Sequence, residues 1–206
     1  MTMPRPWRFA GTWAVLGAAL LIAAIAWRHD LERTMTRHML VQIPMLLTAG
    51  VACSRCLSAL PHGPGLLRRL GAWDAHGLTG LLVFLLTTAY WMIPRALDSA
   101  VASVAAEQAK MVSLVVAGFL LPASLARANT ILQLFFLGNF ASMMAIVGML
   151  YQDAPQRLCN FYLVDDQVWA GMGLVALAIA IPLLWCLCLE SVRDYFAGKS
   201  AAQQAG

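Results

Sequence analysis

The feature that most constrains the fold is a series of long apolar segments, because a helix needs about 20 apolar residues to cross a bilayer. Six such segments follow one another along the chain. They cover residues 9–27, 35–60, 73–93, 107–125, 130–151 and 168–189. The sequence therefore predicts an all-α fold, a polytopic integral membrane helix bundle of about six transmembrane helices. We expect one membrane domain over residues 1–206, with a disordered tail at 198–206.

The composition excludes an ordinary soluble enzyme or a nucleic-acid binder. Hydrophobic residues make up 61% of the chain and charged residues 12%, against roughly 25% charged in globular proteins. The formal net charge of +4 is not gathered into a basic patch interleaved with aromatic residues, as nucleic-acid binding would require. No phosphate loop, nucleophile triad or zinc-protease motif is present in the sequence. We therefore expect a non-enzymatic protein whose surroundings are membrane lipid.

The first segment admits a second interpretation as a signal peptide. Arg5 and Arg8 form a basic leader, and Ala24-Ile25-Ala26 resembles a small-residue cleavage site. The apolar stretch is longer than a usual signal core, which favours an uncleaved helix.

The distribution of Lys and Arg predicts the orientation, since cytoplasmic loops carry an excess of both. With an even number of spans, both termini lie on one side. Eight basic residues fall on that side: Arg5, Arg8, Arg55, Arg68, Arg69, Arg127, Arg193 and Lys199. Six fall on the other: Arg28, Arg33, Arg37, Arg95, Lys110 and Arg157. We expect both termini in the cytoplasm and assign the chain to a bacterial inner (plasma) membrane.

A stretch at the start of the second span carries soft metal ligands. Positions three and four apart share a helix face, so Met35, His38, Met39 and Gln42 line one stripe. Thioethers and imidazoles suit copper, which predicts a Cu(I) site at the outer mouth of this helix. The alternative is that the Met side chains fill gaps in a core and that His38 is a hydrogen-bonded interfacial residue.

Acidic residues before the last span extend this prediction. Asp165 and Asp166 either favour the N-terminus of the last helix or contribute to binding a metal or a partner. On the predicted topology they face the His38 stripe, and Lys110 or Arg37 could pair with them. The predicted metal ligands are thus His38, Met35 and Met39, with Asp165 and Asp166 nearby.

Two other arrangements are candidate sites. Cys53-Ser54-Arg55-Cys56 and Cys186-Leu187-Cys188 provide thiols near the cytoplasmic face, which either bind a metal or pack as small apolar side chains. A haem held by His38 and His76 would need both at one iron. The two begin adjacent antiparallel spans at opposite surfaces, roughly 30 Å apart, so one iron cannot reach both.

Two short motifs point to a family. The first is His38-Met39-Leu40, followed by Pro44, Leu46, Leu47 and Gly50. The second is Asp166-Gln167-Val168-Trp169-Ala170-Gly171. They resemble the His-Met-Leu-Leu…Pro-Leu-Leu…Gly core and the Asp-Gln-x-x-Ala-Gly motif of the caa3-type cytochrome c oxidase assembly factor family, often called CtaG. The resemblance covers residues 33–187 and implies a helical membrane protein that serves respiratory oxidase assembly by delivering or holding copper.

The chain also departs from that family. Thr34 stands where the family usually has a further His, Arg37 stands where Gln is usual, and six spans replace the usual seven. Three functions therefore stay open. The first is a copper-handling assembly protein for cytochrome c oxidase in the respiratory chain. The second is a structural accessory subunit of a larger respiratory or other membrane complex without its own metal. The third is a haem- or quinol-binding membrane subunit.

Overall fold

The computed structural model describes residues 6–61 and 63–188, and within them the regular structure is entirely helical, with no strand. The predicted all-α class is confirmed, and the predicted tail at 198–206 lies outside the described residues. The helices are α1 (Pro6–Ala26), α2 (Arg28–Leu31), α3 (Met35–Arg37), η1 (His38–Gln42), α4 (Ile43–Ala59), α5 (Gly63–Leu70), η2 (Gly71–Trp73), α6 (Leu78–Trp91), α7 (Pro94–Ala102), α8 (Val104–Arg127), α9 (Thr130–Asp153) and α10 (Val164–Cys188).

Four helical stretches are long and apolar enough to cross a membrane: Met35–Ala59, Val104–Arg127, Thr130–Asp153 and Val164–Leu187. The pair α6 and α7 makes a fifth if it counts as one span, with a bend of 77° between its halves. The apolar part of α1 in the described chain, Ala10–Ala26, is shorter. These helices indicate a membrane protein.

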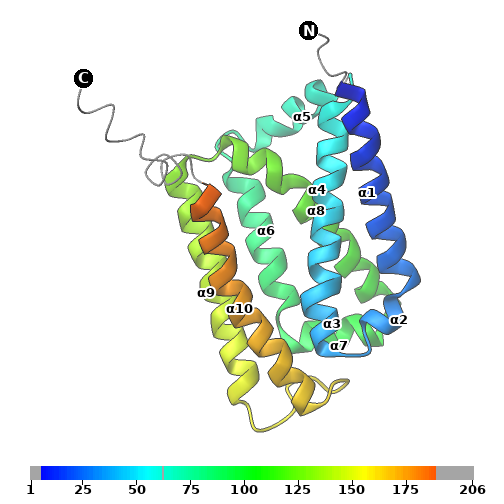
Figure 1. The fold of residues 1–206 in the computed structure, drawn as a ribbon, viewed down its shortest axis with the longest axis vertical. Coiled ribbons are helices and arrows are strands. Elements are labelled where there is room, and N and C mark those ends of the chain that lie inside the picture. Colours follow the sequence, from blue (N-terminus) through cyan, green and yellow to red (C-terminus); the bar gives the residue numbers. More distant parts are fainter. Residues whose placement is uncertain (1–5, 62, 189–206) are drawn as a thin grey trace, which may run out of the picture.

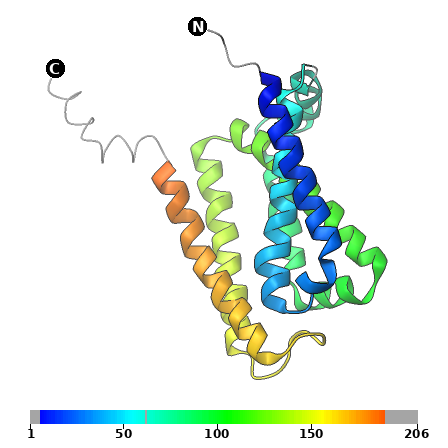
Figure 2. The ribbon, with the colours of Figure 1, turned by 45° about the vertical axis from the view of Figure 1, so that its right-hand side comes forward.

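The helices pack in a chain of neighbours. α1 packs on α4, α4 on α8, α8 on α6 and α7, α6 on α9, and α9 on α10 (Figures 1 and 2). α1 begins and α10 ends at the same end of the bundle, beside α5, which we name the α5 end (Figure 1). The opposite end carries α2, α3, α7 and the 154–163 loop, and we name it the α7 end (Figure 1).

α4 and α8 run parallel and touch through glycine. A Cβ atom at Gly50 would collide with Val115 O, and one at Gly118 would collide with Leu47 O. These glycines therefore allow the two backbones to approach more closely than any side chain would permit. This close contact fixes the register in which α8 presents its first turns to η1.

A π-helical turn, η1, joins α3 to α4. Its wide hydrogen bond runs from Ile43 N–H to His38 O, five residues back. Pro44 explains the widening, because proline has no N–H to donate and its ring crowds the carbonyl four residues earlier, here Leu40. Such π turns often occur at functional sites.

The bend between α6 and α7 has two causes. Pro94 cannot continue a helix, which agrees with the prediction that the third span ends there. The Tyr151 hydroxyl from α9 donates to Met92 O at 2.6 Å, so the freed end of α6 has a partner. As a result α7 lies across the α7 end and leads the chain into α8.

A polar cluster ties α6 to α8 at the α5 end. Asp74 accepts the Gly80 N–H at 3.3 Å and the Ser124 hydroxyl at 2.6 Å. Arg127 Nη1 lies 3.5 Å from Oδ2, the oxygen that accepts from Ser124. Gly77, at φ 76°, makes the turn into α6, which begins at Leu78 and not at Trp73 as the hydropathy predicted.

Candidate functional site

The centre of the candidate site is the ammonium group of Lys110, in the second turn of α8. The residue has no exposed surface. Its Nζ donates to Glu32 Oε1 at 2.6 Å, to His38 Nε2 at 2.8 Å and to Gln42 Oε1 at 2.9 Å. An ammonium has three protons, and here each of them has an acceptor. Gln42 Nε2 also donates to Glu32 Oε1, at 3.2 Å, so the four residues form a closed network.

His38 joins this network to the 154–163 loop. Its Nδ1 lies 2.6 Å from the hydroxyl of Tyr162. Because a protonated ammonium can only donate, Nε2 of the ring must accept from Lys110. The neutral ring therefore carries its proton on Nδ1, which donates to the Tyr162 oxygen. Both ring nitrogens of His38 are thus engaged.

A second carboxylate lies beside this network. Glu107, one turn before Lys110, pairs with Arg28 at 3.3 Å, while its Oε1 is buried and has no hydrogen-bond partner among the described residues. A surface pocket of about 410 Å³ touches Glu107 and is lined by both acidic and basic side chains. They include Arg28, His29, Glu32, Arg33 and Glu107. The network thus opens toward the surface on its Glu32 side.

The Asp-Gln pair of the second motif has structural partners. Asp166 accepts the N–H groups of Met35 and Thr36 and the Thr36 hydroxyl, the last at 2.6 Å, so this residue of α10 caps α3. Gln167 donates to Tyr151 O at 3.0 Å and accepts from Leu158 N at 2.9 Å. The pair therefore fastens α10 to α3 and holds the 154–163 loop. Lys110 pairs with Glu32 and not with these carboxylates.

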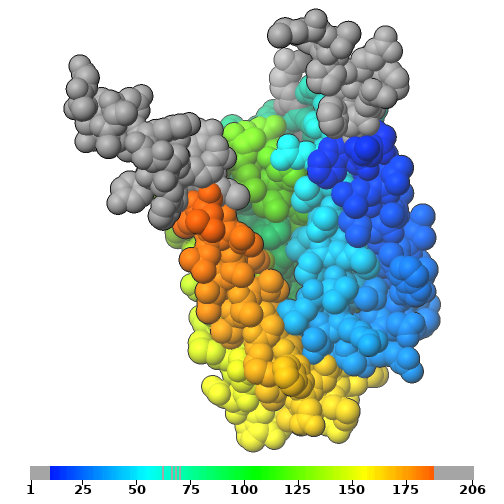
Figure 3. All heavy atoms as spheres, in the orientation of Figure 1, coloured from blue at the N-terminus to red at the C-terminus, as the bar shows by residue number. Residues whose placement is uncertain are grey.

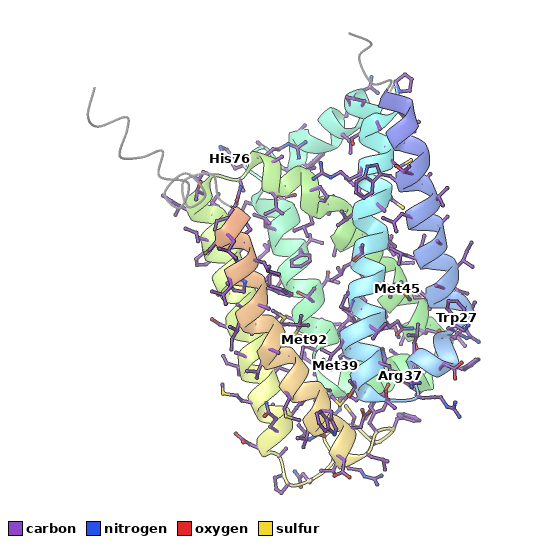
Figure 4. The ribbon with its side chains drawn as sticks, in the orientation of Figure 1. Trp27, Arg37, Met39, Met45, His76 and Met92 are labelled. Carbon is purple, nitrogen blue, oxygen red and sulfur yellow. The ribbon has the colours of Figure 1, made fainter. Side chains whose placement is uncertain are left out.

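The soft side chains gather on the other side of η1. Five sulfur-bearing residues are buried in one core cluster at the α7 end: Met35, Met39, Met92, Met144 and Cys159. Three of them, Met39, Met92 and Met144, also line one apolar cavity. Figure 4 shows Met39 near Met92, whereas Met45 lies farther along α4. Thioethers from three separate helical segments are thus brought together.

The predicted metal ligands fall into two groups. His38 and Asp166 are hydrogen-bonded to Lys110, Tyr162 and α3, and Asp165 is exposed. An ion at His38 would have to displace one of its two partners. Met35 and Met39 lie in the sulfur cluster. In residues 6–61 and 63–188 no group of three or more His, Cys, Asp or Glu side chains could hold a metal.

The other predicted arrangements are placed as follows. His76 follows η2 at the α5 end, while Arg37 and Met39, the neighbours of His38, lie at the α7 end (Figure 4). The expectation that one iron cannot join His38 and His76 agrees with this. Cys53 and Cys56 are half-buried free thiols, and Cys53 lies against Gly17 of α1.

Burial shifts the acidity of two groups in the 154–163 loop. Burial and the nearby Asp98 carboxylate raise the pKa of the Cys159 thiol to about 12. Burial, together with the Glu32 carboxylate, raises the pKa of the Tyr162 hydroxyl. Both groups therefore keep their protons at neutral pH, and Tyr162 stays a neutral partner for His38.

The sequence reasoning missed the role of Lys110 and Glu32. Glu32 was given no role, and Lys110 was counted among the outer basic residues, as a possible partner of Asp165 or Asp166. Lys110 and Glu32 are 78 residues apart in the chain, so no local spacing relates them. The one available signal was a Glu and a Lys at positions 107 and 110, at the edge of an apolar helix with no acidic neighbour on the following turns.

The fold and the site define a class: a helical bundle of membrane-spanning type with a buried Lys–His–Glu–Gln network beside a methionine cluster. Comparisons with protein-family models, with curated proteins and with solved structures found no match to this chain.

Proposed function

We propose that this chain is a non-enzymatic, multi-pass protein of a bacterial inner membrane that assists the assembly of a respiratory oxidase and holds Cu(I) near the outer surface. The family resemblance of the His38 and Asp166 motifs supports the first part. The observation that carries the second part is the convergence of buried thioethers at the α7 end.

The thioethers suit this role because of their chemistry and their position. Soft sulfur ligands select Cu(I) over harder ions. Met39, Met92 and Met144 come from η1, the end of α6 and α9, so the fold must bring them together. In this proposal they are the ligands, and His38 is a positioning residue that Lys110 and Tyr162 hold against η1.

The proposal includes six crossings with both termini in the cytoplasm. The α7 end is then outside, and α1 and the α6–α7 pair count as spans. Lys110 is buried, so it leaves the count of outer loop charges, which falls from six to five against eight on the cytoplasmic side. The positive-inside rule therefore favours this orientation more than the sequence alone suggested.

The test is copper stoichiometry. The detergent-purified chain is loaded with Cu(I) under reducing conditions, and bound copper is measured per chain. We expect about one copper per chain in the wild type and none above background when Met39, Met92 and Met144 are all changed to Leu. Met-to-Leu changes keep the core volume and cost little stability, so lost copper would not reflect lost folding.

His38 supplies the matched control. The variant His38→Gln keeps copper if the thioethers are the ligands. Loss of copper in His38→Ala and His38→Gln, with copper kept in the triple Leu variant, would place the metal at His38 as the sequence first predicted.

A second candidate function is a structural accessory subunit without a metal. The closed hydrogen-bond network around Lys110 favours it, because His38 has no free lone pair as the chain is folded. This candidate predicts a metal-free wild-type chain that co-purifies with a larger membrane complex. If the wild-type chain bound no copper, the accessory-subunit function would therefore replace the copper-holding function.

A further inference from the structure

A wedge-shaped groove separates α10 from α4. The two helices meet at the α7 end, where Asp166 caps α3 and the Leu40 side chain packs against Gly173. From there α10 diverges from α4 toward the α5 end in both views (Figures 1 and 2). The space-filling view shows the resulting hollow between α4 and α10 (Figure 3). The groove thus opens sideways, at the depth of the membrane.

The groove contains a cavity of about 370 Å³. Its lining comes from η1, α4, α6, α8, α9 and α10 and is apolar apart from the hydroxyls of Thr48 and Thr88 and the indole N–H of Trp185. Both hydroxyls are already used, since Thr48 donates to Pro44 O at 2.7 Å and Thr88 to Phe84 O at 2.8 Å. The lining therefore offers few hydrogen bonds to an occupant, and it suits a plain hydrocarbon.

The nature of the lining favours an acyl chain as the occupant. A quinone ring or a haem would leave most of its polar groups unpaired, which is costly in an apolar site. A single flexible hydrocarbon chain has no polar group to leave unpaired.

A positive charge stands at the mouth of this groove. Arg55 lies four residues after Val51, which lines the cavity, so both occupy one face of α4. Arg55 is exposed, and its guanidinium has no hydrogen bond or ion pair in the described chain. Arg55 interrupts an apolar span, and a lipid phosphate at the membrane surface would give its charge a partner.

We propose that this groove binds one phospholipid, with an acyl chain between α4 and α10 and the head-group phosphate on Arg55. The lipid comes from the leaflet at the α5 end. It fills the wedge and braces the α9–α10 pair against the rest of the bundle. The acyl chain enters from the end opposite the α7 end, and its cavity is also lined by Met39, Met92 and Met144, the proposed copper ligands.

The test counts lipids retained by the whole chain. The protein is reconstituted in nanodiscs of phosphatidylethanolamine and phosphatidylglycerol, released, and weighed by native mass spectrometry. We expect one retained phospholipid per chain. Arg55→Gln should lower the retained fraction about tenfold, which corresponds to about 1.4 kcal/mol. Val51→Trp should abolish retention by filling the groove.

Arg33→Gln is the control, since Arg33 is exposed at the α7 end, and it should retain lipid like the wild type. Arg55 is a surface residue, so its variant tests the proposal even if Val51→Trp fails to fold. Equal retention in wild type and Arg55→Gln would overturn the proposal. So would a wild-type chain without lipid, or one that retains an isoprenoid quinone.

Discussion

Lys110 shows how a buried charge can be satisfied at the edge of a membrane domain. Taking an ammonium out of water costs several kcal/mol, which only well-placed partners offset. Glu32 provides the opposite charge, and His38 and Gln42 accept the remaining two protons. One residue thereby connects α8, the segment before α3, and η1, and indirectly the 154–163 loop.

We predict that Lys110→Met destabilises the chain by about 3 kcal/mol, because it leaves the Glu32 carboxylate, whose side chain is 11% exposed, without its counter-charge. Thermal unfolding in detergent measures the loss. Adding Glu32→Gln to Lys110→Met should recover part of it, since no buried charge then remains. The exposed pair of Arg33 and Asp30 is the control, and Arg33→Ala should cost less than about 1 kcal/mol. Equal losses in the two single variants would contradict the network.

A second prediction at this scale concerns Cys159. Its thiol ionises near 9.0 when exposed and near 12 in the fold, so between these values the folded chain binds more protons than the unfolded chain. Stability from this group is complete below pH 9.0 and falls as pH rises toward 12. Unfolding midpoints should show an advantage of wild type over Cys159→Ala that is constant at lower pH and shrinks above pH 9.0. A difference that stays constant at alkaline pH would contradict it.

At the scale of elements, the contact between α4 and α8 positions the site. It rests on Gly50 and Gly118, each against a backbone carbonyl that no rotamer change can move. We predict that Gly118→Ala costs about 1–3 kcal/mol through overpacking. It should also separate Lys110 from His38, because it forces the helices apart.

Gly138→Ala in α9 is the matched control for Gly118→Ala. A Cβ at Gly138 meets nothing within 4 Å, so alanine there should be neutral or stabilising by up to about 1 kcal/mol. Thermal unfolding of both variants in detergent makes the comparison. If Gly118→Ala were as stable as its control, the tight packing of α4 on α8 would be wrong.

The sequence predicted elements better than it predicted their connections. Apolar runs located a helix at each of the six segments, because length and hydropathy are local properties. The end of the third span followed from Pro94. The π turn at His38 could not be predicted from the sequence. Pro44 indicates that one backbone hydrogen bond is lost, but not how the preceding helical turn rearranges. Local sequence patterns could not predict the hydrogen-bond partners of Asp166 either, since α3 and α10 are far apart in the chain.

At the scale of the whole molecule, orientation is the testable property. In a chain without native cysteines, Asp165→Cys at the α7 end and Ser58→Cys at the α5 end place one exposed thiol at each end. We predict that a membrane-impermeant maleimide labels Asp165→Cys in intact spheroplasts and Ser58→Cys only after lysis. The reverse pattern would invert the orientation. Labelling of both in intact spheroplasts would require a different number of crossings.

The parallel contact of α4 with α8 also has a consequence for biogenesis. Neighbours in sequence form antiparallel hairpins, but parallel helices need an intervening segment to return the chain, here α6 with α7. During synthesis the α1–α4 hairpin therefore forms before α8 has been inserted. Until then Glu32 and His38 lack the Lys110 ammonium. A translating ribosome that stalls before Lys110 leaves the hairpin half-assembled. We expect such a hairpin to be a substrate for membrane quality control.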